Sequence, residues 1–178
     1  MLFRSVAYAA QGFWGSFATW EDRQSGRWLF APAWGAPHPK AKPFTITNGP
    51  ALHGSIMAFR ITAKNGAPEI VPAWMSRDVN VPEPPIIANG VVLALSSGED
   101  VRQSDAAGLG MNTKERLAGS THATLYAFDS ETGKELFCSG DIITSFTHFG
   151  GIALSNGRVF VSTYDGFVYA FGLKNEEH

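Results

Sequence analysis

A short stretch of the sequence, SRDVNVPEPP at 76–85, gathers polar residues with complementary chemistry: Arg77, Asp78, Asn80 and Glu83. A carboxylate such as Asp78 can accept hydrogen bonds or act as a base, and a guanidinium such as Arg77 can clamp an anion. In a concave site these groups would form a binding site, with Asp78 as the candidate catalytic residue. The alternative is an Arg77–Asp78 pair in a proline-stiffened connection that orients the next structural unit.

Histidine is the second source of possible chemistry, because it can bind a metal or transfer protons near neutral pH. We expect His53 and His148 on the same face of the molecule as the 76–85 stretch. His148 therefore joins Arg77, Asp78, Asn80 and Glu83 as a candidate for cofactor binding. No histidine pair has ligand spacing such as His-x-x-x-His, so we predict no metal site, and loop or packing roles are the alternative.

Two further groups have a plain and a functional interpretation. Glu99, Asp100 and Asp105 are interspersed with basic residues, which predicts a solvated loop and leaves a calcium site as the alternative. Four tryptophans fall between residues 14 and 34. Their alternation predicts packing between structural units, and stacking on a planar ligand such as a quinone or a sugar is the alternative. These tryptophans are Trp14, Trp20, Trp28 and Trp34.

Composition sets broader limits. The chain has 178 residues, 44% of them hydrophobic and 12% aromatic, which suits one domain with a core. A net charge of -2 lacks the basic footprint of a nucleic-acid binder, so we predict no nucleic-acid partner. Cys138 is the single cysteine, which excludes an internal disulfide. No apolar run approaches the length that a membrane-spanning helix needs, so we predict no transmembrane segment.

The elements that must position these residues are strands. Short apolar runs rich in Val, Ile, Phe and Tyr are separated by Asn-Gly, Asp-Gly and Thr-Gly, which predicts an all-β fold. Only residues 111–118 favour a helix, and they are too few to carry a core. The predicted strands are 15–20, 27–33, 55–62, 69–75, 84–88, 91–97, 122–128, 134–138, 150–154, 158–164 and 167–172.

The chain also repeats itself. Residues 14–35, 83–99 and 149–166 share one hairpin pattern, and 54–74 matches 123–137, so the repeating unit is a four-stranded meander. In such a meander the loops after the second and fourth strands share a face. We therefore expect the long insertions 34–54 and 98–121 to open on the same face as 76–84 and 139–149.

One segment carries a family resemblance. AFDSETGKELF at 127–137 resembles the tryptophan-docking signature of PQQ-like (pyrroloquinoline-quinone-like) propeller repeats. Asp129 and Thr132-Gly133 would form the turn, and Phe137 would be the aromatic that docks between blades. The first repeat matches less well, because Arg60 stands where Asp is expected, although Trp74 occupies the docking position.

The resemblance implies an incomplete β-propeller of about three four-stranded antiparallel blades. The blades would cover about 14–76, 83–139 and 149–173, with residues 3–9 as the outer strand of a preceding blade. Propellers close with about four to eight blades, so three cannot complete a ring. The implied partners are the rest of a propeller, a second copy of this chain, or another protein. The family resemblance also implies a periplasmic or secreted protein.

Two functions of different class follow from the resemblance. The first, which we favour, is a non-enzymatic scaffold or binding module without a cofactor. The alternative is part of a PQQ- and calcium-dependent dehydrogenase of alcohols or sugars, and carbohydrate binding is a third possibility. The dehydrogenase chemistry uses a vicinal cysteine pair, which this chain lacks, and only Asp78 and Asn80 could take its base and metal roles.

Overall fold

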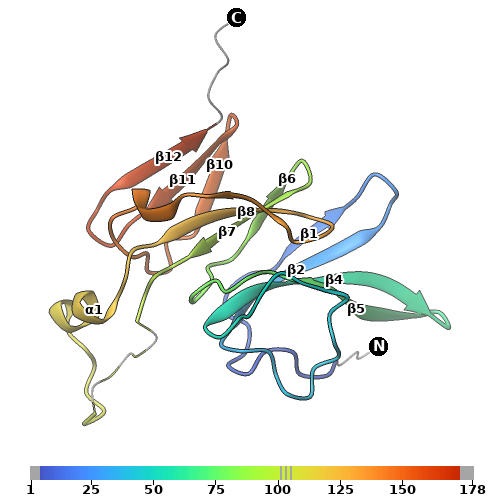
Figure 1. Cartoon of the computed structure of the whole chain (residues 1–178), viewed down its shortest axis with the longest axis horizontal. Helices are drawn as coiled ribbons and strands as arrows, with labels where there is room; N and C mark the ends of the chain where they lie inside the picture. Colours follow the sequence, from blue (N-terminus) through green and yellow to red (C-terminus); the bar gives the residue numbers. More distant parts are fainter. Residues whose placement is uncertain (1–4, 101, 103, 105, 173–178) are drawn as a thin grey trace, which may run out of the picture.

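Three antiparallel sheets follow one another along the chain (Figure 1). This computed structural model describes residues 5–100, 102, 104 and 106–172. The predicted all-β class is confirmed, and within the described residues none of the sheets closes on itself. The same part of the chain contains no helix that is long and apolar enough to cross a membrane.

The first sheet is a meander with one added strand. Its spatial order is β1-β2-β4-β5-β3, in which the short β3 runs parallel to β5. The prediction missed β3, because a strand of two residues is too short to show alternation. The bounds are β1 Ala18–Glu21, β2 Arg27–Trp34, β3 Ile46–Thr47, β4 Gly54–Lys64 and β5 Ala67–Met75.

The second and third sheets are plain meanders of four and three strands, and each strand lies where the sequence predicts one. A short helix, α1, lies in the insertion between β7 and β8; it buries none of its residues and stands apart from the sheets (Figure 1). The bounds are β6 Ile86–Ala88, β7 Val91–Ser96, α1 Thr113–Gly119, β8 Thr124–Asp129, β9 Glu135–Cys138, the 3-10 turn η1 Gly140–Ile142, β10 Ile152–Ser155, β11 Arg158–Ser162 and β12 Val168–Gly172.

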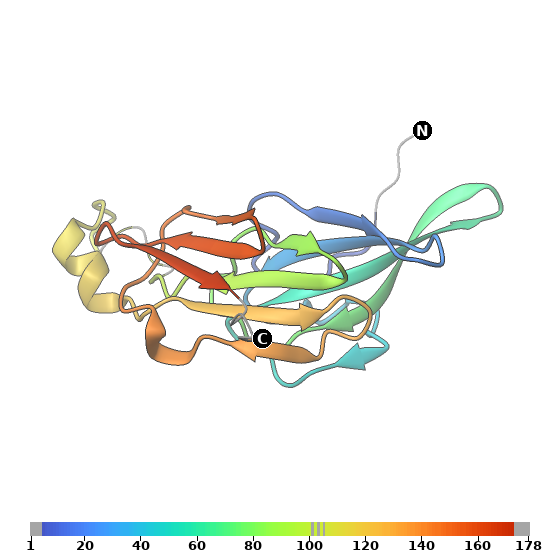
Figure 2. The ribbon, with the colours of Figure 1, turned by 90° about the horizontal axis from the view of Figure 1, so that it is seen from above.

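The sheets stack face to face, with the second between the other two, and the strands of all three lie along nearly the same axis (Figure 2). Because successive side chains of a strand point to opposite faces, strands β6, β7 and β8 of the middle sheet each contribute to two cores. On β8, Phe128 packs toward the first sheet and Leu125 toward the third. Fully burying a side chain of this size stabilises the fold by about 1.5–3 kcal/mol.

The three sheets repeat one side-chain register across their second and third strands. A large residue faces an alanine in every sheet: Phe30 opposite Ala58, Leu93 opposite Ala127, and Phe160 opposite Ala170. The first two pairs are buried under the following sheet, whereas Phe160 is half-buried and Ala170 exposed. The structure therefore repeats a packing surface three times and covers it twice.

Aromatic residues on the last strand of the first and of the second meander reach the next sheet. Trp74 of β5 is fully buried, and its Nε1 donates to the Ser130 carbonyl oxygen in the turn after β8, at 2.8 Å. Phe137 of β9 lies 6.2 Å from Phe171 of the third sheet, ring centre to ring centre. The expected packing of Trp74 and Phe137 across sheet boundaries is confirmed.

The turn before Phe137 also forms as predicted. One oxygen of Asp129, Oδ1, accepts hydrogen bonds from the backbone N–H groups of Glu131 and Thr132 and from the Thr132 hydroxyl. Gly133 has φ +69°, the left-handed region that glycine adopts without strain. The side chain of Asp129 and the backbone of Gly133 thus shape the turn that receives Trp74.

In the first sheet, Arg60 stands at the position that corresponds to Asp129, and it forms an ion pair that the sequence did not predict. Arg60 Nη1 donates to Asp22 Oδ2 at 2.9 Å, and the guanidinium lies 4.5 Å from the Trp28 ring centre. The Trp28 indole hydrogen bond lowers the pKa of Asp22, together with backbone bonds from Gly26 and Gln24 and the charge of Arg60, although burial opposes them. Asp22 thereby anchors the β1–β2 turn.

The segment before β1 lies over the outer face of the first sheet. Residues 3 and 4 of the expected strand 3–9 lie outside the described residues, and 5–8 form no strand. Tyr8 is buried against Phe59, at 4.8 Å between ring centres, and Ala9 bridges to Pro37. Whether 3–9 belongs to a preceding blade stays a prediction.

Candidate functional site

The longest connections of the chain meet on one face of the molecule, here called the loop face, and a binding site is expected there. One cleft of about 250 Å³ is lined by His53 from the first insertion, Asn80 from the 76–85 stretch, and Glu99 and Gly119 from the second insertion. This confirms a common face for the connections 34–54, 76–84 and 98–121, and for the connection 139–149 His148 lies 2.8 Å from Glu99.

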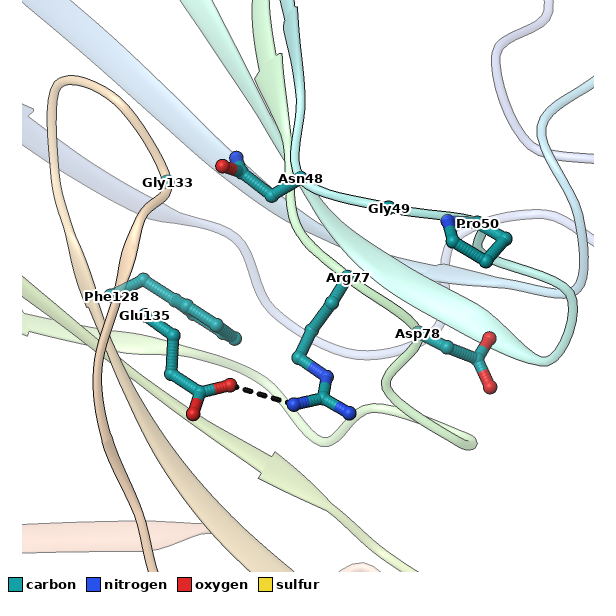
Figure 3. Close-up of a pocket in the computed structure, with 8 residues that line it drawn as sticks. All are labelled: Asn48, Gly49, Pro50, Arg77, Asp78, Phe128, Gly133 and Glu135. Carbon is teal, nitrogen blue, oxygen red and sulfur yellow. Dashed lines mark hydrogen bonds and ion pairs between the residues drawn. The ribbon is translucent and has the colours of Figure 1, made fainter.

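Arg77 and Asp78 lie in a neighbouring cleft of about 350 Å³ between the first and second sheets (Figure 3). They point in different directions and form no pair with each other. Arg77 Nη1 donates to Glu135 Oε2 at 2.9 Å, and the guanidinium lies 5.5 Å from the Tyr126 ring centre. The hydrogen bond to Glu135 raises the pKa of Arg77, against a smaller opposing effect of burial.

Asp78 instead holds the first insertion in place. Its Oδ1 accepts the backbone N–H groups of Leu52 and His53 at 2.7 and 2.8 Å, and its Oδ2 lies 2.7 Å from His53 Nδ1. Burial raises the pKa of Asp78, but the hydrogen bonds from His53 and Leu52 and the charge of His53 outweigh it, so the pKa is lowered. An ionised carboxylate with three hydrogen-bonding partners is a weak base and a strong clamp.

Glu83 and His148, which the sequence only placed on one face, meet in a buried cluster with Glu99 and Arg116. His148 Nδ1 lies 2.8 Å from Glu99 Oε1 and 3.1 Å from Arg116 Nη2, and Arg116 also pairs with Glu99. Only 7% of Glu83 and 4% of Glu99 is exposed. The cluster joins the second sheet, the start of the third sheet and α1.

The prediction of a solvated acidic loop is wrong for Glu99 and Asp100. Glu99 is buried in this cluster, and the Asp100 carboxylate pairs with Arg102 with only a tenth of its side chain exposed. Asp105 lies outside the described residues. The cluster could not be predicted from the sequence, because Arg116 on α1 returns to Glu99 from the far end of a long insertion.

The cluster shifts the pKa values of its members in opposite directions. Burial raises the pKa of Glu83; the backbone amides of Phe149 and Gly150 and the positive charge of His148 only partly oppose this. Burial and the nearby Arg116 guanidinium lower the pKa of His148, against the effect of Glu83. The cluster thus combines two buried carboxylates, an imidazole with a lowered pKa and the permanent positive charge of Arg116.

A small cavity of about 160 Å³ adjoins Glu83. Most of its wall is apolar, and the exceptions are the two buried glutamates. Two tryptophans stack at its side, with Trp14 and Trp34 at 4.9 Å between ring centres and 23° between planes. The lining residues are Trp14, Gly15, Trp34, Val81, Pro82, Glu83, Pro84, Glu99, Phe149 and Gly151.

The four early tryptophans therefore separate into two groups. Trp28 belongs to the core between the first and second sheets and Trp20 packs against it, which confirms the packing prediction for both. Trp14 and Trp34 instead border the cavity beside Glu83. Strand alternation could not distinguish them, because Trp14 precedes β1 and Trp34 ends β2.

The residues that a PQQ and calcium site would require do not converge. Asp78 lies in the cleft between the first two sheets, Asn80 lines the loop-face cleft, and Glu83 borders the small cavity. Across the described residues, no group of three or more His, Cys, Asp or Glu side chains is placed to hold a metal. The Cys138 sulfur accepts a hydrogen bond from the Gly140 amide.

Comparisons with protein-family models, with curated proteins and with solved structures each found no match to this chain. The arrangement of its own residues therefore carries the functional argument.

Proposed function

We propose that the chain is a non-enzymatic binding or scaffold module built from three propeller-type blades. The observation that carries the proposal is the repeated pairing of a large residue with alanine: Phe30 with Ala58, Leu93 with Ala127, and Phe160 with Ala170. The first and second sheets each use this surface to hold the next sheet of the chain. The same surface on the third sheet is therefore suited to holding a further sheet. The function is then recognition through this surface.

The third surface, here called the open face, is the outward face of the last sheet. Its apolar side chains are Ala153, Phe160, Val168 and Ala170, and Ser155, Arg158 and Ser162 lie on the same face. Val168 is 70% exposed, and β12 is an edge strand within the described residues. Exposed apolar side chains next to an unpaired strand edge favour association with another sheet. The partner would be the rest of a propeller, a second copy, or another protein, in an extracytoplasmic setting.

The dehydrogenase alternative has no comparable support. Its proposed base, Asp78, already accepts hydrogen bonds from Leu52 and His53, and its proposed metal ligand, Asn80, lies in a different cleft. Asp78 and Arg77 both serve to fix loops at the boundary between the first two sheets. We assign them a structural role.

A titration with PQQ and calcium chloride separates the two functions. Tryptophan fluorescence and quinone absorbance follow the purified protein and its Asp78→Asn variant. We expect no saturable, calcium-dependent change in either protein. Calcium-dependent PQQ binding that is saturable in the wild type and lost in Asp78→Asn would overturn the scaffold proposal in favour of the dehydrogenase.

A further inference from the structure

The cavity beside Glu83 combines features that the scaffold role does not use. Aromatic rings line it, from Trp14, Trp34 and Phe149, and Trp14 is half exposed, so that side of the cavity reaches solvent. Its volume of about 160 Å³ is below the roughly 300–1,000 Å³ of pockets for drug-sized ligands. The cavity therefore suits one small chemical group.

The charge at the cavity is negative. Glu83 is 93% buried and held by the amides of Phe149 and Gly150, and among the described residues no Arg or Lys lies within 4.0 Å of its carboxylate. Glu99 also lines the cavity, but Arg116 already pairs with it. The cationic group that acts on the Glu83 carboxylate is His148, whose own pKa is lowered by burial and by Arg116. A buried carboxylate with such a weak counter-charge is costly, and a bound cation would offset that cost.

The backbone around the cavity is strained as well. Val81 has φ +46° and Phe149 has φ +50°, a region that residues with a Cβ adopt only at a cost of about 1–3 kcal/mol. For a β-branched residue such as Val81 this is a rare conformation. The surrounding fold keeps both residues in place, and these are two of the residues that shape the pocket walls.

We propose that this cavity binds a small organic cation through its ammonium group. The Glu83 carboxylate would provide the counter-charge, and the faces of the tryptophan rings would attract the cation. An anion would add a second negative charge beside Glu83, and a neutral ligand would leave that carboxylate unbalanced. This site is independent of the open face, so it can succeed or fail without affecting the proposed scaffold function.

Choline is a suitable probe, because 3,3-dimethyl-1-butanol has the same shape without the charge. Isothermal titration of both ligands into the full chain at pH 8 measures the effect of the charge. We expect saturable choline binding and at least tenfold weaker binding of the neutral alcohol. No saturable choline binding, or equal affinity for the two ligands, overturns the proposal.

Variants then assign the site. Glu83→Gln removes the charge and should weaken choline binding at least tenfold, whereas Glu131→Gln, a matched change in the exposed turn before β9, should have no effect. Trp14→Leu removes one half-exposed ring and should weaken choline binding several-fold. If Glu83→Gln fails to fold, the affinity of Trp14→Leu for choline tests the proposal instead. Unchanged affinity in Glu83→Gln, or in Trp14→Leu where only that variant folds, overturns the proposal.

Discussion

At the scale of single residues, the buried cluster shifts the pKa values of neighbouring groups in opposite directions. Glu83 and His148 both lose hydration, and each is pushed toward its neutral form: the pKa of the acid rises and that of the base falls. Each charged form also favours the other, so the shifts are partly opposed. Stability should therefore depend on pH through this cluster.

The histidine gives the clearest prediction. In the unfolded chain His148 takes up a proton near pH 6.5, whereas in the folded protein, beside Arg116, it does so only at lower pH. Between those values the unfolded state binds more protons, so the free energy of unfolding falls as the pH drops. His148→Gln should reduce this slope in urea unfolding between pH 7.5 and pH 5.5 (roughly the range in which histidine titrates).

The control for that experiment is His122→Gln, a change at a partly exposed ring that faces the fully exposed Asp141. It should leave most of the slope in place. A slope that is the same in His148→Gln and in the wild type would contradict the assigned surroundings of His148.

Asp78 gives a second prediction at this scale. Its lowered pKa means that its stabilising effect is complete above the unfolded value near pH 3.9 and is lost as the pH falls through the folded value. Asp78→Asn should lower the free energy of unfolding at pH 7 by about 1 kcal/mol, because it removes the charge that strengthens its hydrogen bonds. The effect is no larger because the side chain is 35% exposed and solvent screens its charge. The difference from the wild type should disappear at acid pH, and a constant difference would contradict the role of its charge.

At the scale of elements, the turn after the third strand of the second sheet carries a contact with the first sheet. Gly133 lies under Trp74, where an added Cβ would come within 2.4 Å of the indole ring. The equivalent turn of the first sheet contains Gly66, at φ +77° and with no atom within 4 Å of such a Cβ. Two glycines with the same backbone conformation thus differ only in what lies above them.

This pair supports a matched experiment on packing between sheets. Gly66→Ala should cost about 1 kcal/mol, from backbone strain alone. Gly133→Ala should cost at least about 3 kcal/mol, because overpacking adds to the strain and pushes Trp74 away from the Ser130 carbonyl. Chemical unfolding monitored by tryptophan fluorescence measures both, and equal costs would show that Trp74 does not dock on this turn.

At the scale of the whole molecule, the stack of sheets is asymmetric. The outer face of the first sheet is covered by the segment that carries Tyr8 and by the first insertion, which contributes Phe44. The open face of the third sheet has no such cover among the described residues. Contacts between molecules should therefore form at the third sheet.

Self-association is the simplest outcome at that face. The mass of the chain by light scattering should rise above 19.2 kDa with concentration, and Val168→Lys, which places a charge on the open face, should hold it near 19.2 kDa. Leu109→Lys is the control, because Leu109 is 67% exposed and belongs to the second insertion, not to the strands of the third sheet. A wild-type mass of 19.2 kDa at every concentration would contradict association between copies at this face.

The sequence by itself determined the strands and their order. Alternating apolar residues, the Asn-Gly and Asp-Gly turns and the repeated hairpin are local signals, so β1, β2 and β4 to β12 could be predicted, as could the turn at Asp129 and the docking of Trp74 and Phe137. The short β3 could not, because two residues show no period and pairing with β5 is a tertiary contact.

Only the tertiary structure decided which polar residues meet. Arg77 and Asp78 are adjacent in sequence but take separate partners, Glu135 on strand β9 and His53 on the first insertion. Glu83, Glu99 and His148 are distant in sequence but share a buried cluster. The physical reason is that strand patterns depend on residues that are near neighbours in the sequence. Ion pairs and cavities depend instead on how the insertions fold back over the sheets, and composition and residue spacing do not predict that folding.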